Sequence, residues 1–161
     1  MKRQLTLERT YHAPLDLIWE LWTTRDGIES WWGPEGFQTT VQKLELKVGG
    51  TLIYTFTAVG PEQIAFMKQS GQPLEQRLTA RYTVVEPMTC VAWSNLADFI
   101  PGVTPYEVET RVELKETAAG VHLTLKFDAM HEEKWTQLAA AGWQSELGKL
   151  EKAITARRKN P

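Results

Sequence analysis

The C-terminal part of the chain carries one long apolar stripe at helical spacing, and this stripe most constrains the fold. The pattern predicts a helix from about residue 132 to 156, roughly 35 Å long. The stripe consists of Trp135, Ala139, Gly142, Trp143, Glu146, Leu147, Leu150 and Ile154. Because a helix with one apolar face must bury that face against another element, the rest of the chain has to supply the matching surface.

Most of the remaining chain alternates apolar and polar residues with the period of β-strands. The predicted strands cover 5–11, 39–48, 52–56, 78–84, 91–95, 108–114 and 121–127. Imperfect alternation within 39–48 predicts a β-bulge. Two short helices are expected between the first two strands, one starting after Ala13-Pro14 and one carrying Ile28 to Trp32.

These elements predict a single α+β domain over residues 1–161. A curved antiparallel sheet of about six to seven strands would surround the long C-terminal helix, and the two short helices would close one end. The segment 60–76 is expected to be a long loop, with a possible helical turn around 64–68. A second irregular loop is expected over 97–104.

Composition narrows the functional classes. The 161 residues have a formal net charge of −2, so no basic excess favours nucleic acid or an anionic membrane surface. The single cysteine, Cys90, allows no internal disulfide, which fits a reducing compartment. The first nine residues lack the apolar run of a signal peptide, and no stretch is long enough to span a bilayer. We therefore expect a cytoplasmic protein.

No motif in the sequence indicates metal, cofactor or nucleophilic chemistry. The three histidines, His12, His122 and His131, lack the spacing of metal ligands. The 33–36 segment, Gly-Pro-Glu-Gly, is not a phosphate-binding loop, and no serine occupies a G-x-S-x-G turn. We therefore assign no catalytic residue, metal site or cofactor from the sequence.

Aromatic residues on the predicted inner faces indicate a binding cavity between the sheet and the long helix. Seven tryptophans in 161 residues is an unusual number. The candidate ligand-binding residues, which would line this cavity, are Trp32, Phe37, Tyr54, Phe56, Tyr82, Trp93, Thr110, Phe127, Trp143 and Glu146. The tyrosine hydroxyls would supply polar contacts to a ligand.

Each of these residues also has an explanation that needs no ligand. The aromatic side chains can simply fill the core, and Trp31 with Trp32 can anchor the second short helix to the sheet. Glu146 can sit at the edge of the helix stripe and reach water; if buried, its pKa would rise and could suit acid–base chemistry. Both interpretations remain open at the level of the sequence.

The chain as a whole resembles the family of activator-of-Hsp90-ATPase-like proteins, within the START/polyketide-cyclase (SRPBCC, Bet v 1-like) superfamily. The matching residues, in order, are Arg9-Thr10-Tyr11-His12-Ala13-Pro14, Ile18-Trp19, Trp31-Trp32-Gly33-Pro34, Gly49-Gly50, Gly142-Trp143, Leu147 and Leu150. The resemblance implies the helix-grip fold, but it implies no single activity.

Three functions follow as hypotheses. The first is a protein that binds a small apolar or aromatic molecule in the cavity. The alternatives are a co-chaperone-like module that contacts a chaperone, and a cyclase- or hydrolase-type enzyme that uses acid–base groups in the cavity. A homodimer is possible in each case, since an edge strand or an aromatic loop could pair with a second copy.

Overall fold

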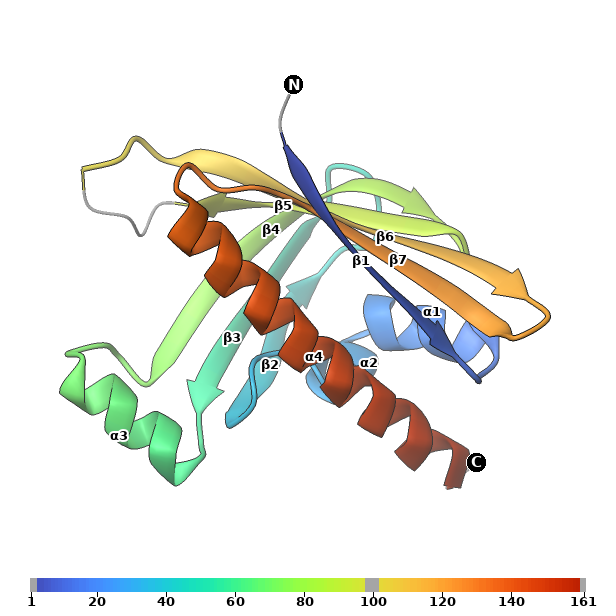
Figure 1. Cartoon of the computed structure of the whole chain (residues 1–161), viewed down its shortest axis with the longest axis horizontal. Helices are drawn as coiled ribbons and strands as arrows, with labels where there is room; N and C mark the ends of the chain where they lie inside the picture. The colour runs from blue at the N-terminus through green and yellow to red at the C-terminus, as the bar shows by residue number, and fades with distance from the viewer. Residues whose placement is uncertain (1–2, 98–101, 160–161) are drawn as a thin grey trace.

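A computed structural model describes residues 3–97 and 102–159 of the chain (Figure 1). The elements, in chain order, are β1 (Gln4–Tyr11), α1 (Leu15–Thr23), α2 (Arg25–Glu29), β2 (Phe37–Leu44), β3 (Thr51–Ala58), α3 (Pro61–Gln69), β4 (Glu75–Glu86), β5 (Cys90–Ala97), β6 (Tyr106–Thr117), β7 (Gly120–Asp128) and α4 (Glu133–Lys159). The predicted helix-grip fold is confirmed. The expected 97–104 loop lies partly outside the described residues.

One antiparallel sheet contains the seven strands in the order β1-β7-β6-β5-β4-β3-β2. Every neighbouring pair except β1–β7 follows directly in the sequence, so the sheet is a run of hairpins to which the first strand is added at the end. The predicted bulge is present, because the pairing of β2 with β3 shifts between Val41 and Lys43.

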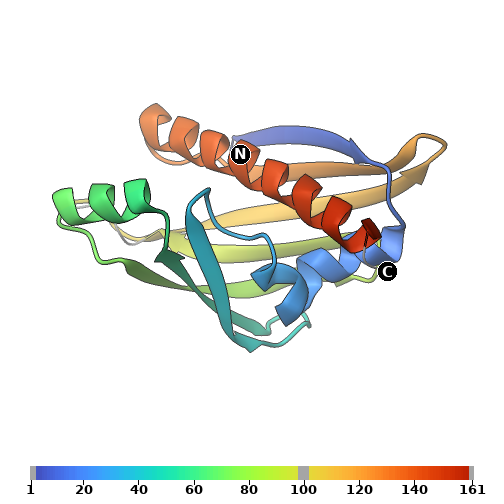
Figure 2. The same ribbon diagram turned by 90° about the horizontal axis from the view of Figure 1, so that it is seen from below.

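Helix α4 crosses one face of this sheet, and α1 and α2 lie toward its C-terminal half (Figures 1 and 2). The contact of α4 with the core is uneven along the length of the helix. Leu147, Leu150 and Ile154 are buried, whereas Leu138 in the first half is 62% exposed. The C-terminal half of α4 therefore holds the helix to the core.

The two short helices follow β1 as predicted, although α2 begins earlier than the sequence suggested. The Thr24 side chain accepts a hydrogen bond of 3.0 Å from the Gly27 backbone N–H, which starts α2 at Arg25. The second short helix was expected to carry Ile28 to Trp32, but α2 ends at Glu29, and Trp31 and Trp32 follow it. An N-cap threonine of this kind favours a helix start.

The expected long loop over 60–76 is wrong for most of its length, because Pro61–Gln69 forms the nine-residue helix α3 and β4 begins at Glu75. The helical turn expected around 64–68 lies inside α3. Pro61 starts this helix at a position where its missing N–H costs nothing. Met67 is its one buried residue among the described side chains, and Phe66 is 64% exposed. The short apolar face explains why the sequence pattern showed only a turn here.

No described helix is long and apolar enough to span a membrane.

Candidate functional site

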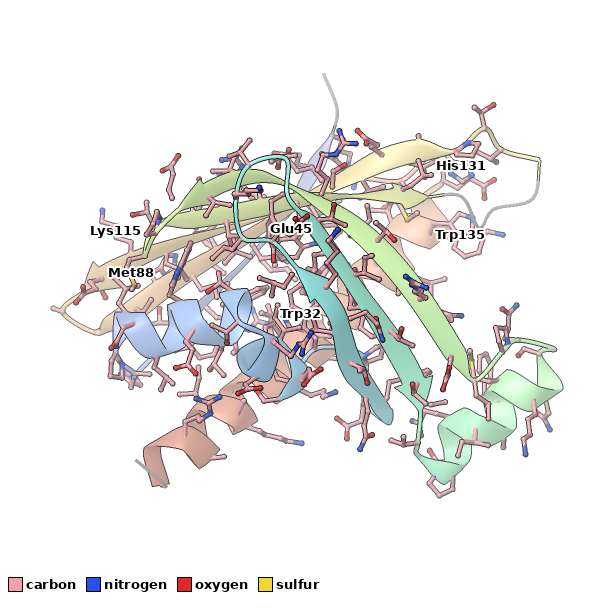
Figure 3. All side chains as sticks on the ribbon, turned by 180° about the vertical axis from the view of Figure 1, so that it is seen from behind. Trp32, Glu45, Met88, Lys115, His131 and Trp135 are labelled. Carbon is pink, nitrogen blue, oxygen red and sulfur yellow. The ribbon has the colours of Figure 1, made fainter. Side chains whose placement is uncertain are left out.

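Five tryptophans from different parts of the chain meet beneath α4. This tryptophan cluster consists of Trp22 from α1, Trp31 and Trp32 after α2, Trp93 from β5 and Trp143 from α4. The Trp32 and Trp93 ring centroids are 5.2 Å apart, and Trp143 lies 6.1 Å from Trp22 and 6.4 Å from Trp93. Figure 3 shows Trp32 within the dense side chains behind β2 and β3.

The cluster continues onto the sheet through two further aromatic residues. The Tyr54 ring packs edge-on against Trp32 at 5.3 Å, and Phe56 follows Tyr54 at 5.3 Å. Tyr82 pairs with Trp93 across the β4–β5 ladder. The inner faces of β3, β4 and β5 thus supply one continuous aromatic surface.

The ten residues predicted from the sequence divide by burial into two groups. Trp32, Tyr54, Tyr82, Trp93, Thr110 and Phe127 are buried. Phe37, Phe56, Trp143 and Glu146 are only partly buried. Thr110 on β6 pairs with Trp93 on β5 and with Phe127 on β7, so these three residues continue the aromatic surface toward β7. The partly buried residues lie where solvent still reaches the site.

Three polar atoms in this region have no hydrogen-bond partner among the described residues. They are the indole Nε1 atoms of Trp22 and Trp32 and the hydroxyl of Tyr82, all three buried. Their neighbours differ: Trp31 Nε1 donates to the Leu21 carbonyl at 2.8 Å, and the Tyr54 hydroxyl accepts from Asn95 at 3.2 Å. Unpartnered buried donors are uncommon, and a bound molecule or ordered water usually explains them.

Helix α4 is tied to the 33–37 loop, the segment from Gly33 to Phe37, by two charged side chains one turn apart. Glu146 Oε1 accepts a 2.9 Å hydrogen bond from the Gly33 N–H. Lys149 Nζ donates to the carbonyls of Gly33, Pro34 and Phe37 at 2.9, 3.5 and 3.3 Å. The loop that borders Trp32 is therefore fastened to the helix over the site.

Burial changes the proton affinity of these groups. Desolvation raises the pKa of Glu146 to about 7, although the Gly33 N–H and the charge of Lys149 both act to lower it. Desolvation likewise lowers the pKa of Lys149, which Glu146 partly opposes. Burial raises the pKa of Tyr54, and the charges of Glu146 and ionised Tyr82 would raise it further. The Tyr54 hydroxyl thus lies within electrostatic reach of both Glu146 and Tyr82.

Two open cavities lie away from this region. One, of about 400 Å³, lies beside the start of α4 and is bordered by Arg3, Tyr106, His131 and Glu133. The other, of about 320 Å³, is bordered by Gln4, Thr83 and several polar neighbours. None of the ten predicted residues borders either cavity. In the first, Arg3 is already paired with Glu133 at 2.7 Å, which leaves little free charge for a ligand.

Within residues 3–97 and 102–159, no group of three histidine, cysteine, aspartate or glutamate side chains could hold a metal ion.

Sequence reasoning missed two members of the site. Trp22 was not among the ten candidate residues, yet its ring contacts four other tryptophans. Lys149 lies three residues after Glu146, a spacing that places both on one side of a helix. That spacing was the available signal, but no local pattern identifies the backbone carbonyls of the 33–37 loop as partners.

Comparison with known proteins identifies the family. A family model described as Activator of Hsp90 ATPase homolog 1-like protein matches residues 12–155. The chain belongs to this family. The match confirms the resemblance drawn from the sequence, within the START/SRPBCC group.

Solved structures of several bacterial proteins share the fold. A crystal structure of a Chromobacterium violaceum protein has a TM-score of 0.75 and 21% identity, covering 94% of this chain and 96% of that one. The solution structure of an AHSA1-like protein from Aeromonas hydrophila has a TM-score of 0.72 and 22% identity, covering 96% and 94%. An AHSA1 protein from Silicibacter pomeroyi gives 0.72 and 18%, covering 96% and 99%. A comparison with curated proteins gave no match.

Proposed function

We propose that this protein binds a small, partly apolar molecule with a flat or aromatic body, held between α4 and the inner face of the sheet. The observation that carries the proposal is the set of three buried, unpartnered donors inside an otherwise aromatic cluster. Each such atom costs about 1–3 kcal/mol when left unpaired, so a fold that served packing alone would gain by replacing it.

The surroundings of these donors suit such a ligand. Aromatic side chains provide large apolar contact area, and a few convergent polar groups fix orientation. Trp143 and Phe56 are partly exposed beside the buried cluster and offer a route to it. The first half of α4 has few buried side chains, so we expect local opening there to disturb fewer core contacts than opening at Leu147 and Leu150.

Native mass spectrometry of freshly purified protein, followed by denaturation, tests the proposal directly. We expect a released small molecule in a fixed ratio to the protein, or binding of added apolar aromatic probes. Trp143→Ala removes the ring that α4 contributes and is expected to abolish binding. Trp135→Ala, on the same helix but outside the tryptophan cluster, is the matched control and should bind normally.

A protein that carries no bound molecule and excludes every apolar probe would contradict the proposal. In that case the chaperone-related role considered from the sequence becomes the better hypothesis, and titration with a purified chaperone would test it.

A further inference from the structure

The three side chains that carry the unpartnered donors are all neighbours of one residue, Trp93. The Trp93 centroid lies 5.2 Å from that of Trp32 and 6.1 Å from that of Trp22. Tyr82 stands beside Trp93 on the neighbouring strand. The side chains of all three donors are at most 3% exposed. The residues with unpartnered donors therefore gather around the same part of the aromatic surface.

All three groups can donate a hydrogen bond. An indole Nε1–H can only donate a hydrogen bond, and a tyrosine hydroxyl can donate as well as accept. All three are neutral, and burial raises the pKa of Tyr82, which keeps its hydroxyl protonated. These groups would complement an acceptor oxygen on the ligand.

The charged groups nearby argue against a ligand anion. Lys149, the cation tied to the site, already directs its ammonium group at three backbone carbonyls. Glu146, one turn before Lys149 on α4, supplies no positive charge and would repel a second negative charge once it is ionised. A buried anion needs a paired cation, whereas a carbonyl needs only donors.

We propose that the ligand carries an uncharged acceptor oxygen, such as the carbonyl of a ketone, ester, amide or lactone, which the Trp32 indole and the Tyr82 hydroxyl bind. The inference rests on the proposed function and specifies its ligand class. The flat apolar part of the molecule would lie against Trp93 and Trp143.

Three probes of similar shape distinguish a ligand with an uncharged acceptor oxygen from a purely apolar ligand and from an anion. Acetophenone carries the carbonyl, α-methylstyrene replaces that oxygen by a methylene group, and benzoate replaces the acetyl group by an anion. Each is titrated into uniformly ¹⁵N-labelled protein while the indole N–H resonances are followed by NMR. Trp32→Phe and Trp31→Phe assign the two adjacent indole signals.

We expect acetophenone to move the Trp32 indole proton downfield, as a new hydrogen bond does, and α-methylstyrene to leave it without such a shift. Tyr82→Phe should weaken acetophenone binding roughly three- to tenfold and should not weaken α-methylstyrene binding. Because this hydroxyl has no partner in the described structure, its removal should not unfold the protein. Tyr106→Phe, whose hydroxyl already has partners and which lies outside the tryptophan cluster, is the matched control.

The outcomes are distinct. If α-methylstyrene binds but acetophenone causes no indole shift and no dependence on Tyr82, the ligand class is wrong while the binding site stands. Tighter binding of benzoate than of acetophenone would also overturn the class. If none of the three probes binds at its solubility limit, the proposed function fails together with this inference.

Discussion

At the scale of single residues, Glu146 is the group with the strongest expected pH dependence. Its pKa of about 7 in the folded protein lies above the ordinary value of 4.5 because the carboxyl is desolvated. The folded state therefore holds this proton more tightly than the unfolded state does. The stability that the group contributes is fully present below about pH 4.5 and is lost as the pH rises through 7.

Glu146→Gln tests this pH dependence, since the amide does not titrate and its oxygen can still accept from Gly33. We expect the unfolding free energy of the wild type, relative to the variant, to fall by roughly 2–3 kcal/mol between pH 4.5 and 7.5. Urea unfolding at several pH values measures the difference. A constant difference across that range would show that the carboxyl is hydrated.

Lys149 is expected to act on the 33–37 loop. Lys149→Met removes the ammonium donor from three backbone carbonyls and should cost about 1–3 kcal/mol of stability, although the Pro34 carbonyl still accepts from the Phe37 N–H. Hydrogen exchange of the loop amides should accelerate in the variant. Lys152→Met, at an exposed position one turn later, is the control and should change stability by less than about 0.5 kcal/mol. Equal effects of the two substitutions would contradict the role of Lys149.

At the scale of elements, two helical glycines have opposite surroundings. A Cβ at Gly27 in α2 would meet the backbone of Glu20 and lie 2.7 Å from Leu21 Cα, whereas a Cβ at Gly148 in α4 would meet nothing within 4 Å. Gly27→Ala should destabilise the protein by about 1–3 kcal/mol through overpacking. Gly148→Ala should stabilise it by about 0.5–1 kcal/mol through helix propensity.

Thermal and urea unfolding of the two variants measures both effects side by side. If Gly27→Ala were as stable as the wild type, the close packing of α2 on α1 would be wrong. Loss of stability in Gly148→Ala would indicate that this face of α4 is covered in solution.

The elements also show how far the sequence could predict the fold. The strands and α4 were predictable because one face of each is solvated and the other is buried. Their apolar residues therefore recur at regular spacing in the sequence. Helix α3 was not, because it buries only Met67 among its described side chains and leaves almost no pattern. The start of α2 depended on one hydrogen bond from the Gly27 N–H to the Thr24 side chain. The sequence did not predict this start, because a glycine usually indicates a break in a helix.

The site was predictable only in part for a related reason. Parity along the strands identified Tyr54, Tyr82 and Trp93 as inward-facing residues, and they are buried. Which donors lack partners depends on contacts between segments far apart in the chain, such as Glu146 with Gly33. No local pattern records those contacts.

At the scale of the whole molecule, Cys90 reports on global opening. It lies on β5 in the middle of the sheet and is buried, and burial raises the pKa of its thiol. Because the thiolate is the reactive form, we expect native protein to react with a thiol reagent only as fast as it unfolds. Labelling with Ellman's reagent across a urea series measures this rate. Rapid labelling in buffer alone would show that β5 opens locally.

The pairing of β1 with β7 has a consequence for synthesis of the chain. Tyr11 pairs with Val121, which the ribosome adds 110 residues later. At about 5–20 residues per second, β1 waits on the order of 5–20 s for its partner. During that time its backbone N–H and C=O groups are open to wrong strands, yet Thr6, Glu8 and Thr10 keep one face of it polar. Strand β1 therefore joins the sheet only after β7 is made, and we expect its polar face to limit wrong pairing in the meantime.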